Sequence, residues 1–307
     1  MNRTSVIVPA FNREEMLVRA LASVFRQSRP PDEVVVVDDA STDDLSEAKR
    51  FAESEGAVWV QLDENKGPAF ARNRGAAEVA GDWICFLDSD DVWEETKLER
   101  QLEWHEHHPE VPISQVEEGW IRNGVGVNKP KHWEQKSGDL FAESVERCSI
   151  GPSCVMMSRQ RWEAAGGFDP RFRVCEDYEL WLRVCSSGIV GLVNGGPLVQ
   201  KHAGHKDQLS VCTPAMDRFR VVALLEHFLS RGFTAAHRDL MAKGIESKSA
   251  ILSAGAQKRG AHERAAFYSE LAGGAFITSN DKGVENLIFR AWRHATDQSS
   301  SKIRFSP

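Results

Sequence analysis

Apolar and polar positions follow two regular patterns over roughly the first hundred residues. Short apolar runs, typical of buried strands, alternate with longer stretches in which apolar residues recur at helical spacing. The apolar runs predict strands at residues 5–8, 33–37, 58–62 and 83–87. The stretches between them predict helices at residues 17–25, 44–55 and 68–80. Because strands that alternate with helices form parallel sheets with right-handed crossovers, the pattern predicts an α/β fold.

The pattern is less regular in the rest of the chain. Further strands are predicted at residues 113–123, 151–158 and 190–200, with helices at 138–147 and 177–186. From Thr213 onward only helical spacing recurs, at residues 216–229, 235–258 and 262–271. The last stretch is polar and is expected to be a partly disordered tail. The organisation that we expect is a mixed α/β domain at 1–212 with halves at 1–110 and 111–212, a helical C-terminal extension at 213–274, and a tail at 275–307.

Composition narrows the classes of function. The net charge is −7, which argues against a nucleic-acid-binding protein because such proteins carry a basic surface. The six cysteines include no C-x-x-C pair, so we expect reduced thiols in a cytoplasmic protein. The start of the chain lacks the features of a signal peptide, and no apolar stretch reaches the ~18 residues of a membrane span. Peripheral attachment to the inner face of a membrane stays open.

Three acidic residues within four positions follow the predicted strand at 83–87, namely Asp88, Asp90 and Asp91. In α/β sheets, ligands bind in the crevice at the carboxyl ends of the strands. Carboxylates spaced i and i+2 can share a hard divalent cation, whose remaining positions can be filled by phosphate oxygens. The alternative is that Asp90 or Asp91 caps a helix that begins near residues 92–95. These residues alone leave both interpretations open.

The sequence does not carry the complete motifs of several common nucleotide-binding and phosphate-binding folds. The first strand is followed by Pro9, Ala10, Phe11 and Asn12 instead of a glycine-rich turn, and no P-loop motif occurs. The stretch 86–90 matches the D-x-D opening of haloacid-dehalogenase-like phosphatases, with Asp88 as nucleophile. In that family the first aspartate opens the domain, whereas here several strand-helix units precede it. The phosphatase is kept as an alternative.

Four motifs in order resemble those of family 2 glycosyltransferases of the GT-A fold. They lie at residues 6–12, 35–43, 65–75 and 88–90, and the resemblance covers about residues 4–212. It implies an inverting enzyme that moves one sugar from a nucleotide-diphosphate sugar, by default a UDP-sugar, to a hydroxyl of a glycan or lipid-linked sugar acceptor. It also implies Mg²⁺ or Mn²⁺ as cofactor and a role in cell-surface polysaccharide or glycoconjugate synthesis. The Q-x-x-R-W motif of processive members is absent, which favours transfer of single sugars.

The resemblance also implies roles for individual residues of the nucleotide-binding half. The residues that it implies in binding the nucleotide sugar are Pro9, Ala10, Phe11, Asn12, Asp39, Asn65, Gly67, Arg72, Asp88 and Ser89. In this assignment Asp39 accepts from a base N–H, Asp88 lies on the ribose side, and Asp90 ligates the metal. The alternatives are that Asp38 and Asp39 are a turn or helix-cap pair, and that Arg72 and Arg74 are solvated helix charges.

The half at residues 111–212 contains the candidate catalytic base. Glu176 and Asp177 match the family's Glu-Asp motif at the start of a predicted helix, which implies that Asp177 accepts the proton of the acceptor hydroxyl and that Glu176 assists. The alternative is that both acids only stabilise the helix N-terminus. Residues 115–123 and Trp133 are candidates for the acceptor side, although packing of an exposed strand explains them equally well.

A histidine is the second candidate metal ligand. His205 precedes Ser210 at the spacing found in many relatives, and the resemblance therefore implies that His205 completes the metal shell. His202 is the competing candidate, and an ordinary polar loop is a third interpretation. The C-terminal helices favour neither dimerisation nor membrane docking, and a non-catalytic GT-A-fold binding or scaffold protein is the last alternative.

Overall fold

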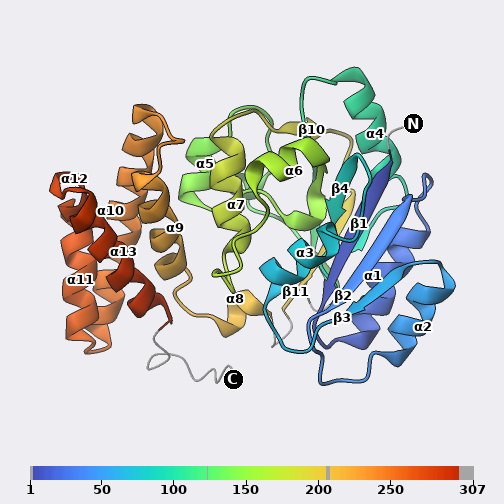
Figure 1. Ribbon diagram of the computed structural model, residues 1–307, viewed down its shortest axis with the longest axis horizontal. Coiled ribbons are helices and arrows are strands. Elements are labelled where there is room, and N and C mark those ends of the chain that lie inside the picture. Colours follow the sequence, from blue (N-terminus) through green and yellow to red (C-terminus); the bar gives the residue numbers. More distant parts are fainter. Residues whose placement is uncertain (1–2, 123, 205–207, 297–307) are drawn as a thin grey trace. The chain divides into compact units, whose positions relative to one another are not determined.

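The computed structural model describes the chain except for residues 1–2, 123, 205–207 and 297–307. The chain divides into two compact units (Figure 1). Unit one comprises Met1–Leu140 and Cys148–His205, and unit two comprises Phe141–Arg147 and Lys206–Pro307.

Seven strands of unit one form a sheet in the order β10-β6-β9-β4-β1-β2-β3. These strands are β1 (Thr4–Ala10), β2 (Glu33–Asp38), β3 (Val58–Gln61), β4 (Trp83–Phe86), β6 (Ile113–Val116), β9 (Val155–Ser158) and β10 (Gly191–Val193). Strand β9 is antiparallel to both of its neighbours, and the other pairs of this sheet are parallel. The predicted α/β fold with a mostly parallel sheet is therefore confirmed.

Helices cover both faces of this sheet (Figure 1). One face carries α1 (Glu14–Phe25), α2 (Ser46–Ser54) and α4 (Lys97–His107), and the other carries α3 (Pro68–Ala76), α6 (Arg159–Ala165) and α7 (Glu176–Cys185). Because side chains alternate along β1, Val6 joins the core beneath α1, whereas Ile7 faces α3. Strand β1 is buried along its whole length, which explains its continuous apolar run.

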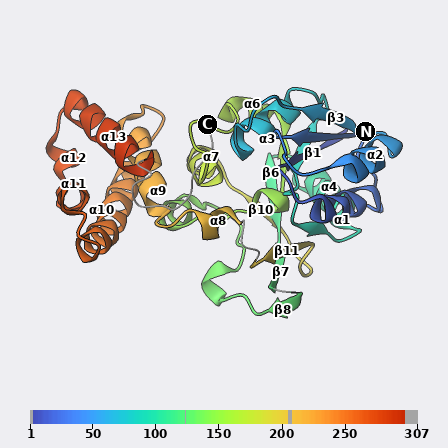
Figure 2. The same ribbon diagram turned by 90° about the horizontal axis from the view of Figure 1, so that it is seen from below.

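A second sheet of unit one has the order β5-β11-β7-β8 (Figure 2). It consists of β5 (Val92–Trp93), β7 (Glu118–Arg122), β8 (Val125–Val127) and β11 (Val199–Ala203). Strand β11 runs antiparallel to β5 and parallel to β7. The alternative of a helix near residues 92–95 is wrong, because that segment pairs as β5 and α4 begins at Lys97. Neither Asp90 nor Asp91 therefore caps a helix there. Short 3-10 helices lie at η1 (Lys131–Trp133) and η2 (Pro152–Cys154).

Unit two is helical. Its elements are α5 (Phe141–Glu146), α8 (Leu209–Cys212), α9 (Asp217–Leu229), α10 (Ala235–Lys258), α11 (His262–Ala272), α12 (Ala275–Thr278) and α13 (Asp281–Thr296). The sequence pattern predicted a polar tail from residue 275, whereas the structure has helices up to Thr296. They form because Val284, Leu287 and Ala291 recur at helical spacing and are buried. Among the described residues, no helix is long and apolar enough to cross a membrane.

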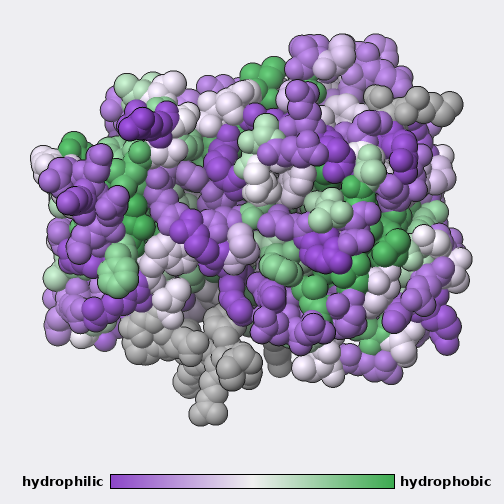
Figure 3. Space-filling view, in the orientation of Figure 1, coloured by the Kyte–Doolittle hydropathy of each residue, from purple (hydrophilic) through white to green (hydrophobic). Residues whose placement is uncertain are grey.

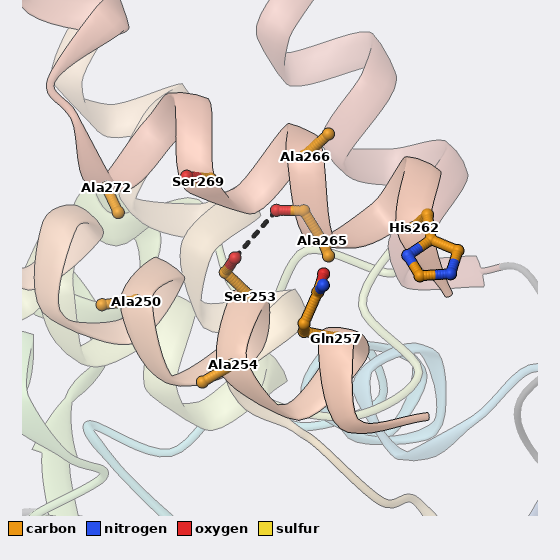
Figure 4. A pocket seen from close by; sticks show the side chains of 9 residues that line it. All are labelled: Ala250, Ser253, Ala254, Gln257, His262, Ala265, Ala266, Ser269 and Ala272. Carbon is orange, nitrogen blue, oxygen red and sulfur yellow. Dashed lines mark hydrogen bonds between the residues drawn. The ribbon is translucent and has the colours of Figure 1, made fainter. Parts of the chain in front are cut away.

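Helices α10 and α11 lie against each other with a hollow of about 530 Å³ between them (Figure 4). Small side chains such as Ala254 and Ala266 line it, and the Ser253 hydroxyl donates to the Ala265 carbonyl at 2.8 Å. On the face drawn in Figure 3, hydrophilic side chains predominate, and apolar side chains form smaller groups among the hydrophilic ones.

The packing of α3 on the sheet gives a test of this architecture. A β-carbon at Gly75 would lie 2.5 Å from Cγ2 of Ile7, so we expect Gly75→Ala to lower the free energy of unfolding by about 1–3 kcal/mol. Gly126→Ala is the matched control because nothing lies within 4 Å of its added β-carbon. Urea unfolding of both variants measures the effect, and equal midpoints would contradict the close approach of α3 to β1.

Candidate active site

Three aspartates gather immediately after β4. One carboxylate oxygen from each of Asp88, Asp90 and Asp91 lies within 4.8 Å of the others. Asp88 and Asp90 are half-buried, and Asp91 is buried. Hard oxygen donors at this density fit Mg²⁺ or Mn²⁺, which bind carboxylates and keep further positions for phosphate oxygens. His202 is not part of this group among the described residues.

Asp91 ties this loop to two other elements. Its carboxylate accepts from the Ser153 hydroxyl at 2.7 Å and from the His202 backbone N–H at 3.2 Å. Burial, and then the charge of neighbouring Asp90, raise the pKa of Asp91 well above its usual range. A cation bound among these carboxylates would favour the ionised form of Asp91.

Arg72 is buried and bridges two carboxylates from different parts of the chain. Its guanidinium donates to Oδ1 of Asp88 at 2.6 Å and to Oε1 of Glu176 at 2.7 Å. Burial opposes the charge of Arg72, but the two carboxylates outweigh it and raise its pKa. The alternative that Arg72 is a solvated helix charge is wrong. Arg74 does fit that description, since it pairs with Glu78 on the surface of α3.

Glu176 and Asp177 stand at the first turn of α7. Burial, together with the negative charge of Asp177, raises the pKa of Glu176 to about 7 against the opposing effect of Arg72. Asp177 Oδ1 accepts from the Tyr178 backbone N–H at 2.7 Å, and Oδ2 accepts from the Cys148 thiol at 3.1 Å. The N-cap position belongs to Cys175, which has a left-handed φ of 62° and makes no side-chain cap. Neither acid is therefore the N-cap residue of this helix.

Asp39 holds the loop that precedes α3. Its two carboxylate oxygens accept from the backbone N–H groups of Lys66 and Gly67, each at 2.7 Å. Burial raises its pKa in spite of these bonds. The Asn65 side chain donates to the Asp39 carbonyl at 3.2 Å, and Gly67 has a φ of 88° that favours glycine. Asp39 does not cap α2, because the N-cap of that helix is Leu45.

The turn after β1 lies next to the loop after β2. Pro9 and Ala10 end β1 and are buried, whereas Phe11 is 42% exposed. Asn12 has a φ of 59°, and its side-chain oxygen accepts from the Thr42 backbone N–H at 2.8 Å. An apolar ring therefore stands in solvent contact where the resemblance implies a nucleotide base.

The remaining candidates fall in three places. Ser89, which lies between Asp88 and Asp90 in the sequence, is buried. His202 is half-buried on β11, where burial lowers its pKa. His205 lies outside the described residues. Trp120 on β7 and Trp133 on η1 have ring centroids 6.0 Å apart, and the Trp120 indole donates to Glu118 at 2.8 Å. The acceptor role of residues 115–123 and Trp133 stays a prediction.

Sequence reasoning missed three residues that the structure brings to this site. Ser153 reaches Asp91 from η2, Cys148 reaches Asp177, and Arg13 pairs with Asp90 at 3.1 Å. Ser153 and Cys148 are isolated in the sequence from the motifs they contact, so no local signal points to them. Arg13 directly follows the motif at 6–12, and its position after that turn was the available signal.

The family model described as "Glycosyl transferase family 2" matches residues 5–148. An uncharacterized glycosyltransferase of Rickettsia felis is 31% identical over 189 residues, which cover 62% of this chain and 31% of that protein. This chain thus spans about a third of the Rickettsia relative. The putative teichuronic acid biosynthesis glycosyltransferase TuaG of Bacillus subtilis is 31% identical over 187 residues, covering 60% of this chain and 72% of TuaG.

Solved structures show the same fold. S. aureus TarS 1-349 in complex with UDP-GlcNAc superimposes with a TM-score of 0.72 at 19% identity, covering 94% of this chain and 87% of that one. The mannosyltransferase PcManGT from Pyrobaculum calidifontis, in complex with GDP-Man and Mn²⁺, gives a TM-score of 0.56 at 21% identity, covering 96% and 85%.

The family match begins at β1 and includes the acid cluster after β4, and the identity to TuaG extends over most of that relative. The chain therefore belongs to glycosyl transferase family 2 and has the GT-A fold.

Proposed function

We propose that this protein is an inverting glycosyltransferase that moves one sugar from a nucleotide-diphosphate sugar to an acceptor hydroxyl. The observation that carries the proposal is the buried bridge of Arg72 between Asp88 and Glu176. One side chain thereby links the acid cluster after β4 to the Glu-Asp pair of α7. This link supports the proposal, because a single displacement requires the diphosphate and the base to be close together, and both are proposed for residues that Arg72 connects.

The donor is proposed to be a UDP-sugar. TarS was solved with UDP-GlcNAc, and the E. coli relative WfaP, 28% identical over 193 residues, is named a UDP-Glc:alpha-D-GlcNAc-diphosphoundecaprenol beta-1,3-glucosyltransferase. The names of WfaP and TuaG also support a lipid-linked sugar or a polysaccharide as acceptor. PcManGT was solved with GDP-Man, so the nucleotide base of the donor is determined by the first experiment below.

Asp90, beside Asp88 and Asp91, is proposed to hold Mg²⁺ or Mn²⁺. Such an ion supplies charge neutralisation for the departing diphosphate. The fit rests on the oxygen donors of the cluster, since one carboxylate oxygen from each aspartate lies within 4.8 Å of the others. Asp88 has the further task of orienting Arg72, and the remaining nucleotide contacts are proposed for Phe11, Asp39 and Asn65.

Asp177 is proposed as the base that accepts the proton of the acceptor hydroxyl. Both of its oxygens are held, one by the Tyr178 N–H and one by the Cys148 thiol, so the carboxylate has a fixed direction. Ionised Glu176 places a second negative charge beside it, which favours proton transfer to Asp177. Family membership argues against the phosphatase alternative. The experiments below distinguish an active enzyme from a scaffold, because a scaffold would bind the donor without transferring sugar.

The first test identifies the donor base and the metal. We expect UDP, with Mn²⁺ present, to raise the melting temperature more than GDP, dTDP or CDP, by a stabilisation of about 2.7 kcal/mol at a hundredfold excess over Kd. Asp90→Ala should melt like the wild type without ligand and lose the metal-dependent part of the shift. Asp63→Ala, at an exposed acid outside the cluster, is the control. A full metal-dependent shift in Asp90→Ala would contradict the metal assignment.

The second test concerns the base. We expect Asp177→Asn to bind the nucleotide with wild-type affinity and to lower the rate of nucleotide release from the donor by about 10² to 10⁴, because proton acceptance is lost. Calorimetric binding and single-turnover rates measure the two quantities. Loss of nucleotide binding or of thermal stability together with the rate would show a structural role, and an unchanged rate would remove Asp177 from the mechanism.

The third test uses pH. The pKa of Glu176 is raised to about 7, so this carboxyl gains its negative charge as the pH rises through that value. We therefore expect the transfer rate to increase across pH 6–8 in the wild type, and this step to be absent in Glu176→Gln, which keeps an oxygen acceptor for Arg72. The same step in both proteins would assign the titration to another group.

A further inference from the structure

Arg13 lies at the start of α1 in an unusual backbone conformation. Both Asn12 and Arg13 have left-handed φ values, 59° and 67°, which side chains other than glycine rarely adopt and which often occur at functional sites. Asn12 is tied down by the Ser41 hydroxyl, which accepts from its backbone N–H at 2.7 Å. The turn therefore fixes where the Arg13 side chain begins.

The Arg13 side chain pairs with the proposed metal ligand. Its Nη1 lies 3.1 Å from Oδ2 of Asp90, and the two side chains are only 19% and 17% exposed. A second arginine, Arg19, donates to the backbone carbonyl of Asp90 at 3.0 Å. Asp90 is thus contacted by Arg13 at its carboxylate and by Arg19 at its backbone.

A divalent cation on Asp90 would compete with Arg13. Both are positive and both use the same carboxylate, so close approach of one weakens the hold of the other. An arginine displaced from a carboxylate finds an equally suitable partner in phosphate, whose oxygens match the guanidinium fork. Arg13 directly follows the turn that the proposed function places beneath the nucleotide, so a diphosphate bound at Asp90 would lie near its guanidinium.

We propose that Arg13 exchanges Asp90 for a phosphate of the donor and thereby makes metal binding and diphosphate binding depend on each other. This inference rests on the proposed function. Without diphosphate, the metal must break the Arg13–Asp90 pair. With diphosphate, the released guanidinium gains a new partner, so each ligand raises the affinity for the other by the same factor. Arg13 would therefore delay metal uptake until the donor arrives.

Mn²⁺ titrations followed by electron paramagnetic resonance test this without relying on turnover. Free Mn²⁺ is measured for the wild type, for Arg13→Asn, and for Arg19→Gln, each alone, with uridine and with UDP. Asparagine is used at position 13 because it tolerates a left-handed φ. Arg19→Gln is the matched control, since it removes the same charge close by but leaves the Asp90 carboxylate paired.

In the wild type we expect UDP to tighten Mn²⁺ binding at least on the order of tenfold, and uridine, which lacks phosphate, to have no effect. In Arg13→Asn, Mn²⁺ alone should bind more tightly than in the wild type, and the tightening by UDP should fall severalfold. Arg19→Gln should behave like the wild type. Thermal melts without ligand check that both variants fold.

Two outcomes would overturn the inference, and they are distinguishable. If UDP tightens Mn²⁺ binding equally in the wild type and in Arg13→Asn, Arg13 does not carry the coupling, and the proposed function stands. If Arg19→Gln loses the coupling to the same extent as Arg13→Asn, the loss of any nearby positive charge is responsible. Arg13 then has no specific role, and the proposed function again stands. If no nucleoside diphosphate among UDP, GDP, dTDP and CDP alters Mn²⁺ binding to the wild type, the proposed function fails, and the inference fails with it.

Discussion

The buried guanidinium of Arg72 is the interaction on which the site depends. It is 4% exposed and bridges Asp88 after β4 and Glu176 at the start of α7, two acids far apart in the sequence. Removing one partner of such a buried pair typically costs about 3–5 kcal/mol, because a charge is then left without compensation. The packing of α3 against β1 through Gly75 places Arg72 where it can reach both carboxylates. The close contact of helix and sheet is therefore also a condition for assembling the site.

Elements with a local periodic pattern could be predicted from the sequence. The four parallel strands and the helices between them lie close to their predicted positions, because burial imposes continuous apolar runs on β1, β2 and β4. Pairing between distant segments left no comparable signal. The antiparallel strand β9 depends on β6 and β4, roughly forty and seventy residues away, and the short strand at Val92–Trp93, where a helix start was possible, depends on β11, roughly a hundred residues away. Helix α13 was missed because the polar composition of the chain's end led to the prediction of a tail, although apolar positions recur there at helical spacing.

The candidate site shows the same division. The acids after β4 and at the start of α7 could be chosen from motifs, but their contacts could not. Cys148 contacts Asp177, and Ser153 contacts Asp91, only because α7, η2 and the loop after β4 fold together. The motif assigned Arg72, and not Arg74 two positions later on the same helix, to the site, but it could not reveal the two carboxylates that Arg72 bridges. Helical geometry turns Arg72 toward the sheet and Arg74 toward solvent, so only the buried Arg72 can hold the carboxylates of the site together.

Burial also separates the two arginines that neutralise the acid cluster. Arg72 faces two carboxylates and almost no water, so exchanging a partner would leave a buried charge unpaired. Arg13 is 19% exposed at the edge of the cluster, and its pair with Asp90 involves less desolvation. The same cluster therefore combines a cation that cannot leave with one that can be displaced. A site of this kind keeps Asp88 and Glu176 in place throughout a reaction cycle, while Asp90 stays available to a cation and its diphosphate.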